Sequence, residues 1–324
     1  MSRYHRQQQV PQIGLESAQL LSQARVLIVG LGGLGGPVAS CLAGAGVGHL
    51  SLIDFDTVDI SNLHRQTLYS EVDVGKSKVA TARIKLQALN SEISIQAEDQ
   101  ALDPSNAEQL VRQHTVVVDA SDSFFVSYLL SDVCLKHRIP LVAASVLQTS
   151  GYVGVFCGTK DQPAPSMRAI FPSPPRDAQN CSTAGVTGPS VGVIASIQAQ
   201  EVLKVILNDS ARLLGKLLYL DLWNYRQNVV DFRHVKEPEK FAGLEMESNF
   251  LESDVLLDVR SATEVADSPR AAKHINIPID KLVERIPELD KSRRIMCVCK
   301  SGQRALNAAH QLMNAGFTKV VVAV

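Results

Sequence analysis

Short apolar runs alternate with amphipathic segments along the first half of the chain. The runs RVLIV, HLSLID, ISIQA, TVVVDA and PLVAAS have strand character, and helical patterns separate them at about 34–46, 75–89, 104–112 and 124–137. Strands separated by helices are typical of a parallel sheet with helices on both faces. The pattern therefore predicts an α/β fold with a doubly wound, mainly parallel Rossmann-like sheet.

The pattern changes after this region. YVGVF and KLLYLDL predict an antiparallel extension of the sheet, and a Pro- and Ser-rich loop covers 161–190. The stretch 235–248 is charged and poor in β-branched residues, which favours a linker. A second alternation of strands and helices follows. We predict an ATP-binding domain over 1–234 and a small α/β domain over 249–324.

Composition narrows the class of protein. The 324 residues are 45% hydrophobic with a net charge of −1, which allows a buried core and gives no sign of nucleic-acid binding. The uncharged stretch 26–48 contains many glycines and Pro37, so a strand that turns into a helix explains it better than a membrane span. The polar N-terminal residues lack the apolar run of a secretory signal. We expect a cytoplasmic protein without nucleic-acid or membrane partners.

A glycine cluster is the first candidate for binding chemistry. Gly30, Gly32 and Gly35 spell G-x-G-x-x-G between a predicted strand and a predicted helix. Such glycines let backbone N–H groups approach phosphate oxygens at the helix N-terminus. Asp54, at the end of the next strand, suits the hydroxyls of a ribose. On these features alone, an NAD(P)-dependent Rossmann oxidoreductase is the most common interpretation.

Three charged residues near the same sheet edge change that interpretation. Arg65 and Lys78 are suited to neutralise a triphosphate, and Asp122, just past the strand TVVVDA, suits Mg²⁺. Nucleotidyl transfer needs positive charge and a metal near the α-phosphate, whereas hydride transfer needs neither. Taken singly, each has a plainer interpretation: Arg65 as part of a surface ion pair, Lys78 as a solvated helix residue and Asp122 as the N-cap of the following helix. Their joint placement favours a site.

Several ordered motifs resemble the E1-like adenylyltransferases of the MoeB/ThiF/HesA family. They are R-Y-H-R-Q at 3–7, V-G-L-G-G-L-G at 29–35, D-F-D-T-V-D-I-S-N-L-H-R-Q at 54–66, G-K-S-K at 75–78 and G-V-T-G-P-S-V-G-V-I-A-S-I-Q-A at 185–199. The resemblance implies a homodimer in which Arg6 reaches the partner's nucleotide site. It also implies ATP and Mg²⁺, held by Asp122, with nucleotide contacts from Gly30, Gly32, Gly33, Asp54, Ser61, Asn62, Arg65, Lys78, Asp122 and Ser123.

Two departures from the family pattern stand out. Members often carry D-N where this chain has Asp122-Ser123, and many bind structural zinc through two C-x-x-C pairs. Here Ser166 and Ala169 occupy the first pair of thiol positions, and neither side chain replaces a thiolate toward Zn²⁺. We predict no structural zinc and a loop held by packing instead.

Cys181 lies in N-C-S-T-A-G within the long loop. Thiolates are strong nucleophiles, and the resemblance places the family's loop cysteine at this position. The functional interpretation is a nucleophile that receives the activated acyl group or an acyl persulfide. The alternative is an ordinary small residue in a loop.

Cys299 is the stronger candidate nucleophile. It ends a predicted strand and begins a loop before a helix, where N–H donors and the helix dipole lower the pKa of a thiol. This C-x4-R loop resembles rhodanese sulfurtransferases, as do D-V-R-S-A-T-E-V at 258–265 and H-I-N-I-P at 274–278, within a shortened domain. The alternative is a core thiol, which we prefer for Cys297. The predicted persulfide loop comprises Cys299, Lys300, Ser301, Gly302, Gln303 and Arg304.

These observations predict a two-step enzyme. The E1-like part adenylates the C-terminal glycine of a ubiquitin-like sulfur carrier, with Arg6, Arg65 and Lys78 stabilising charge in the reaction. A persulfide donor such as a cysteine desulfurase loads Cys299, and sulfur then reaches the carrier, with Cys181 as a second candidate thiol. The product is a thiocarboxylate used in molybdopterin or thiamin synthesis or in tRNA thiolation. The competing hypotheses are the oxidoreductase and a non-catalytic module that binds a ubiquitin-like protein.

Overall fold

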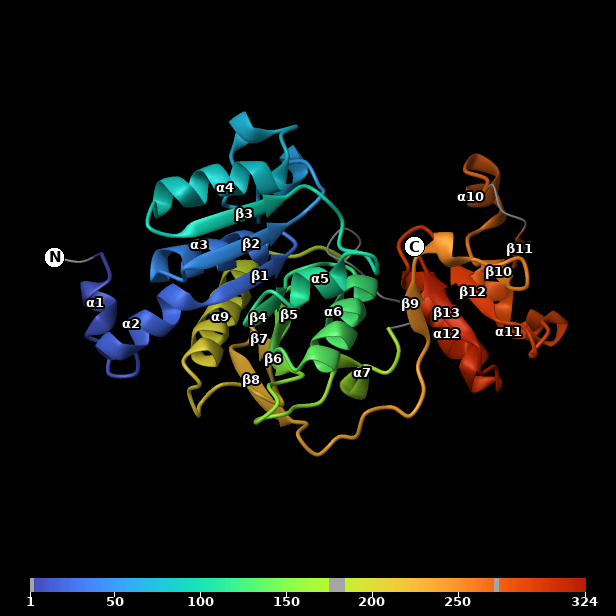
Figure 1. Ribbon diagram of the computed structural model, residues 1–324. Helices are drawn as coiled ribbons and strands as arrows, with labels where there is room; N and C mark the ends of the chain where they lie inside the picture. The colour runs from blue at the N-terminus through green and yellow to red at the C-terminus, as the bar shows by residue number, and fades with distance from the viewer. Residues whose placement is uncertain (1–2, 175–183, 271–273) are drawn as a thin grey trace.

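The chain forms two β-sheets (Figure 1). The structure is a computed structural model that describes residues 3–174, 184–270 and 274–324. The first sheet has the strand order β3-β2-β1-β4-β5-β6-β7-β8, with β1 to β5 parallel and β6 to β8 antiparallel. The strands are Arg25–Val29 (β1), His49–Ile53 (β2), Ser94–Glu98 (β3), Val116–Asp119 (β4), Leu141–Leu147 (β5), Ser150–Phe156 (β6), Lys216–Asp221 (β7) and Arg226–Asp231 (β8). The predicted parallel sheet with an antiparallel extension is confirmed.

Helices cover both faces of this sheet because its central strands are apolar on both sides. On β1, Val26 and Ile28 join the core cluster under α3, α4 and α9, whereas Leu27 and Val29 join the cluster under α5 and α6. The helices are His5–Gln8 (α1), Gly14–Gln23 (α2), Gly35–Ala45 (α3), Lys78–Leu89 (α4), Ala107–Val111 (α5), Phe124–His137 (α6), Met167–Ile170 (α7) and Gly188–Ile206 (α9).

The second sheet is parallel, with the order β11-β10-β12-β13-β9. Its central strands β10, β12 and β13 are short and almost entirely buried. The elements are Gly243–Glu245 (β9), Val255–Asp258 (β10), Ala262–Asp267 (α10), Ile275–Asn276 (β11), Leu282–Arg285 (α11), Ile295–Val298 (β12), Gln303–Asn314 (α12) and Val320–Ala323 (β13). The small α/β unit predicted at the end of the chain is therefore present.

The predicted linker, 235–248, needs a correction. Its later part contains β9, which pairs in parallel with β13 and completes one edge of the second sheet. The three residues of β9 are half-buried, and so short a strand leaves no alternating pattern to detect. Only the earlier part connects the sheets without regular structure, and the exact domain limits stay a prediction.

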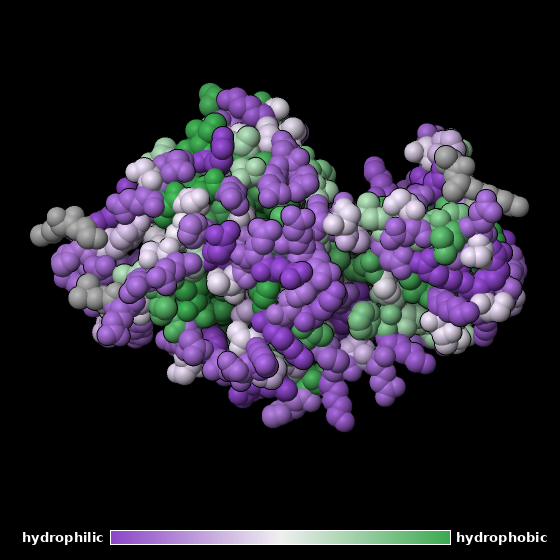
Figure 2. All heavy atoms as spheres, viewed as in Figure 1, coloured by the Kyte–Doolittle hydropathy of each residue, from purple (hydrophilic) through white to green (hydrophobic). Residues whose placement is uncertain are grey.

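The two sheets are joined by a continuous apolar core. One cluster of buried side chains runs from α6 of the first part into β10, β12 and α12 of the second. Figure 2 shows apolar residues at the seam, below a notch between the two parts. Among the described residues, no helix is both long and apolar enough to cross a membrane. The shared apolar core holds the persulfide loop, at the start of α12, against the first part of the chain.

Candidate active site

A cavity of about 530 Å³ lies beyond the carboxyl ends of β1, β2 and β4, the edge at which α/β sheets bind ligands. Of the residues predicted to contact the nucleotide, the structure places all but Ser61 in the cavity wall. Ser61 is exposed, and its hydroxyl donates to Asp59 at 2.5 Å. The residues brought together are Gly30, Gly32, Gly33, Asp54, Asn62, Arg65, Lys78, Asp122 and Ser123.

The glycine loop turns directly from β1 into α3. Gly30 has a φ of +88°, and a Cβ atom there would lie 2.7 Å from the carbonyl oxygen of Ala120. A Cβ on Gly35 would lie only 1.8 Å from the Gly30 oxygen. The close turn brings Gly32, Gly33 and the start of α3 to the cavity, where backbone N–H groups and the helix dipole favour an anion.

Asp54 fixes this loop. One carboxylate oxygen accepts from the Leu31 N–H at 2.6 Å, and the other accepts from the Asp56 N–H at 2.8 Å. Burial raises the pKa of Asp54, and these two hydrogen bonds oppose that rise. The predicted contact with a ribose stays a prediction, and a ribose hydroxyl would share an oxygen that already accepts a backbone N–H.

Asp56 is a cavity residue that the sequence analysis missed. Its side chain is 53% exposed and accepts from Lys78 Nζ at 2.8 Å. The D-F-D spacing is the signal, because side chains two residues apart in extended chain point to the same side, so Asp56 follows Asp54 toward the cavity. Lys78 begins α4 and is 5% exposed, so it is a buried, paired ammonium rather than the solvated helix residue of the plainer interpretation.

Arg65 offers the cavity an unpaired cation. Among the described residues, its guanidinium makes only long contacts, 3.4 Å to the Ser61 carbonyl, 3.4 Å to Asn62 Oδ1 and 3.5 Å to His64 Nε2. Within residues 3–174, 184–270 and 274–324, no carboxylate lies within ion-pair distance of it. The surface ion pair weighed for Arg65 is therefore not formed, and its charge is available to an anionic ligand.

Asp122 lines the same cavity, and its carboxylate accepts no hydrogen bond and forms no ion pair within the described ranges. The N-cap of α6 is Ser123, which accepts from the Val126 N–H at 3.5 Å, so the alternative role of Asp122 as a cap is not realised. In the described part of the chain, no group of three or more His, Cys, Asp or Glu residues is arranged to hold a metal. One carboxylate completed by substrate phosphates is nevertheless the donor set that Mg²⁺ commonly takes, so Asp122 fits this ion.

Gln66 is a second cavity residue that the sequence analysis missed. It is 4% exposed, and its Nε2 donates to Asn62 Oδ1 at 2.7 Å. Its Oε1 is buried without a hydrogen-bond partner among the described residues. A buried acceptor in a ligand cavity suits a ligand N–H or O–H. The only sequence signal was its position beside Arg65.

The persulfide loop contributes to the wall of this cavity from the second sheet. Lys300 and Ser301 line it together with the glycine loop. Gly302 has a φ of +78°, and a Cβ atom there would lie 2.7 Å from the ring of Phe125, which also lines the cavity. The predicted nucleophile Cys299 is 3% exposed and is not in the cavity wall. The Cys299 thiol is therefore buried in this arrangement, because Cys299 belongs to the core shared by the two parts.

Two arginines, Arg304 and Arg270, lie at the persulfide loop. Arg304 forms a bidentate pair with Glu264, at 2.6 and 2.7 Å, and Arg270 donates to the Cys299 carbonyl at 3.0 Å. The pair with Glu264 is the main cause of the raised pKa of Arg304, and the Cys299 thiol adds to it. The loop thus places positive charge near the thiol, as the C-x4-R pattern predicts.

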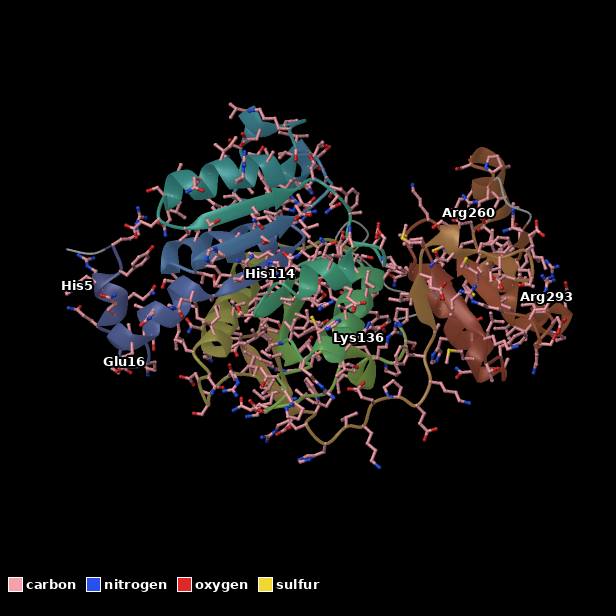
Figure 3. All side chains as sticks on the ribbon, viewed as in Figure 1. His5, Glu16, His114, Lys136, Arg260 and Arg293 are labelled. Carbon is pink, nitrogen blue, oxygen red and sulfur yellow. The ribbon has the colours of Figure 1, made fainter. Side chains whose placement is uncertain are left out.

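Other predicted features lie elsewhere. Cys181 is outside the described residues. Arg6 is exposed in α1 and does not line the cavity, and its neighbour His5 lies at the end of the molecule away from the second sheet (Figure 3). The absence of zinc and the homodimer stay predictions. Where zinc thiolates would stand, Ser166 donates through its backbone N–H and its hydroxyl to Glu237, at 2.7 and 2.6 Å.

Comparisons with known proteins agree with this architecture. The model of the ThiF family matches residues 4–242, and the model of the rhodanese-like domain matches residues 238–324. Both resemblances inferred from the sequence are thereby confirmed.

Curated relatives cover different parts of the chain. "Adenylyltransferase and sulfurtransferase MOCS3" of Culex quinquefasciatus is 42% identical over 68% of this chain and 50% of its own, so the chain spans about half of that relative. "Adenylyltransferase and sulfurtransferase MOCS3-1" of Zea mays is 33% identical over 98% of this chain and 78% of its own. "Sulfur carrier protein adenylyltransferase" of Thermus thermophilus is 41% identical over 68% of this chain and 83% of its own.

Solved structures share the fold of the first part. Escherichia coli MccB with AMPCPP and MccA has a TM-score of 0.62 at 24% identity, and the match covers 72% of this chain and 71% of that one. PaaA has a TM-score of 0.57 at 26% identity, with 71% and 72% covered.

Proposed function

Because the chain belongs to the ThiF family and also carries a rhodanese-like domain, we propose that it adenylates the C-terminal glycine of a ubiquitin-like sulfur carrier and then converts that carboxyl group to a thiocarboxylate. The observation that carries the proposal is one cavity lined by both the glycine loop and the persulfide loop. The printed names of the maize and Thermus relatives, an adenylyltransferase and sulfurtransferase and a sulfur carrier protein adenylyltransferase, support it.

In the first step, a carboxylate oxygen of the carrier attacks the α-phosphorus of ATP. The bond to the bridging oxygen of the β-phosphate breaks, and pyrophosphate leaves. Negative charge builds up on the phosphoryl oxygens, so N–H groups at Gly32 and Gly33 and the guanidinium of Arg65 stabilise the transition state. In a homodimer, Arg6 of the partner adds a further cation.

Mg²⁺, when bound, neutralises phosphate charge and orients the leaving group. Asp122 would hold it. Lys78 keeps the carboxylate of Asp56 in place at the cavity wall, and Asp54 keeps the glycine loop in the conformation that receives the phosphates.

In the second step, a persulfide on Cys299 supplies the sulfur. Its terminal sulfur attacks the acyl carbon, AMP leaves, and an acyl disulfide forms. A second thiol must then attack the Cys299 sulfur, so that the S–S bond breaks and the thiocarboxylate is released. Cys181 is the candidate for that thiol, and its attack leaves a Cys299–Cys181 disulfide. An external thiol reductant must reduce this disulfide before a persulfide donor such as a cysteine desulfurase reloads Cys299.

ATP–pyrophosphate exchange tests the first step. We expect exchange with a ubiquitin-like carrier only when the carrier keeps its terminal glycine and Mg²⁺ is added. Asp122→Ala should lower the exchange rate at least about a hundred-fold, because the ion loses its only protein carboxylate in this proposal. If no sulfur carrier supports exchange and the protein binds NADH, the proposal is wrong and the glycine loop is that of an NAD(P)-dependent oxidoreductase. Trials with molybdopterin, thiamin and tRNA-thiolation carriers would identify the pathway.

A further inference from the structure

We propose that Lys300 of the persulfide loop binds the polyphosphate of the nucleotide held by the first part of the same chain. Nucleotide binding then holds the loop over the cavity and keeps Cys299 covered until the nucleotide chemistry is complete. The inference rests on the proposed function, and it adds a nucleotide contact from the second sheet and a link between nucleotide occupancy and thiol access.

The placement of the loop carries the first part of the argument. Lys300 and Ser301 line the same cavity as Gly32, Gly33 and Arg65. The next residue, Gly302, lies so close to the Phe125 ring that a Cβ atom would be 2.7 Å away. Only glycine permits this approach, so the contact is specific to the sequence of the loop.

The charges of the cavity carry the second part. Its wall contains the carboxylates of Asp54, Asp56 and Asp122 and the cations of Arg65, Lys78 and Lys300. Lys78 is paired with Asp56. Lys300 is exposed and, across the described ranges, forms no ion pair with a carboxylate. An unpaired ammonium beside an anion-binding glycine loop is suited to phosphate oxygens.

The burial of the thiol carries the third part. Cys299 directly precedes Lys300 and is 3% exposed. A persulfide donor cannot reach a thiol so covered, hence the loop must move away from Phe125 for sulfur loading. That movement also withdraws Lys300 from the cavity. By reciprocity, whatever factor Lys300 contributes to nucleotide affinity is the factor by which nucleotide favours the closed loop.

Calorimetric titration of the full chain with AMPCPP, an ATP analogue, tests the contact directly. Lys300→Gln should weaken AMPCPP binding about ten-fold, since a charge-assisted contact to phosphate is lost, and Lys300→Arg should restore most of it. Lys281→Gln removes the same charge from an exposed position of the second part outside the cavity, and it should bind as the unmodified protein does. Unchanged affinity in Lys300→Gln would overturn the proposal.

Alkylation of Cys299 by iodoacetamide, followed by peptide mass spectrometry, tests the coupling. AMPCPP should slow the labelling of Cys299 about ten-fold in the unmodified protein and much less in Lys300→Gln. Equal protection in both proteins, or none in either, contradicts the coupling.

The carrier provides the remaining distinction. If Lys300→Gln raises only the KM for the carrier and leaves AMPCPP binding intact, Lys300 contacts the carrier carboxylate and the nucleotide contact is wrong. If AMPCPP binds with the expected dependence on Lys300 but no carrier supports pyrophosphate exchange, the proposed function fails while the nucleotide contact stands.

Discussion

Gly35 has no room for a side chain, because a Cβ atom would lie 1.8 Å from the Gly30 oxygen. Gly44, in the same helix α3, has nothing within 4 Å of such an atom. The first glycine is therefore required by the turn into the phosphate loop, and the second is not. Two glycines of one helix thus differ in function although both fall within the same glycine-rich stretch, 26–48.

Alanine substitutions should separate the two. Gly35→Ala should destabilise the protein by about 3 kcal/mol or more, because backbone atoms must shift. Gly44→Ala should stabilise it by about 0.5–1 kcal/mol, because alanine loses less backbone entropy than glycine in a helix. Urea unfolding of each variant measures both effects, and equal effects would show that the loop accommodates a side chain.

His114, labelled in Figure 3, is a buried histidine whose ring connects α5 to β2. Its Nδ1 lies 2.7 Å from the Leu110 carbonyl, so it must carry the proton, and Nε2 accepts from the Ser51 hydroxyl at 2.7 Å. Burial lowers the pKa of this imidazole. The unfolded chain therefore binds a proton more readily, and the stability present above about pH 6.5 is lost as the pH falls.

Unfolding at two pH values measures this effect. Between about pH 7.5 and about pH 5.5, the free energy of unfolding should fall more in the unmodified protein than in His114→Gln, which cannot titrate. Other titrating groups contribute equally to both proteins, so the difference isolates the imidazole. Parallel pH profiles would contradict the assignment.

At the scale of elements, Arg168 of α7 contacts both α6 and the chain after β8. Its guanidinium donates to Asp132 at 2.7 and 2.8 Å and stacks on the rings of Tyr128 and Phe241, 4.6 and 4.5 Å from their centroids. Arg168 is 4% exposed. This pair, in which Asp132 is 23% exposed, and the contacts of Ser166 with Glu237 hold the segment that contains α7.

Arg168→Gln should destabilise the protein by about 3 kcal/mol, because Asp132 is left as a largely buried, unpaired carboxylate. Lys136→Gln, on α6 with Asp132, breaks an exposed pair with Glu108 and should cost less than about 1 kcal/mol. Thermal unfolding of the two variants compares them. A small effect for Arg168→Gln would mean that packing alone holds α7.

Local patterns predicted most elements and most of the nucleotide cavity. The glycine loop and the polar residues after β2 and β4 follow from strand ends that meet at one edge of a parallel sheet. The distinct roles of Asp54 and Asp56 did not follow, because they depend on which carboxylate meets the backbone. Nor did the burial of Cys299 or the position of Lys300, which arise from packing between two sheets far apart in sequence.

At the scale of the whole molecule, one cavity is lined by the glycine loop of the first part and by Lys300 and Ser301 of the second. In the proposed function, adenylation and sulfur transfer take place next to each other at this cavity. Tethering a persulfide beside the site where the acyl-adenylate forms raises its effective concentration. The reactive intermediate then meets sulfur before water. This advantage depends on the thiol of Cys299, and not on the thiol of Cys297 in the preceding strand β12.

Cys299→Ser should therefore accumulate carrier adenylate without thiocarboxylate, since serine cannot carry sulfane sulfur. Cys297→Ala removes a fully buried core thiol two residues earlier and should still yield thiocarboxylate, at the cost of some stability. Mass spectrometry of the carrier after reaction with ATP and a persulfide donor distinguishes the products. Thiocarboxylate from Cys299→Ser would assign the sulfur to another residue.

The pairing of β9 with β13 sets an order of events during synthesis. β9 is the first strand of the second sheet to emerge from the ribosome, and β13, its neighbour among the described strands, is the last strand of that sheet. Non-local pairing of this kind delays folding, since the intervening chain must be complete before the edge can close. The first sheet, whose strands are all made earlier, is by then available as a folded surface. We therefore expect the persulfide loop to form against a first sheet that has already folded.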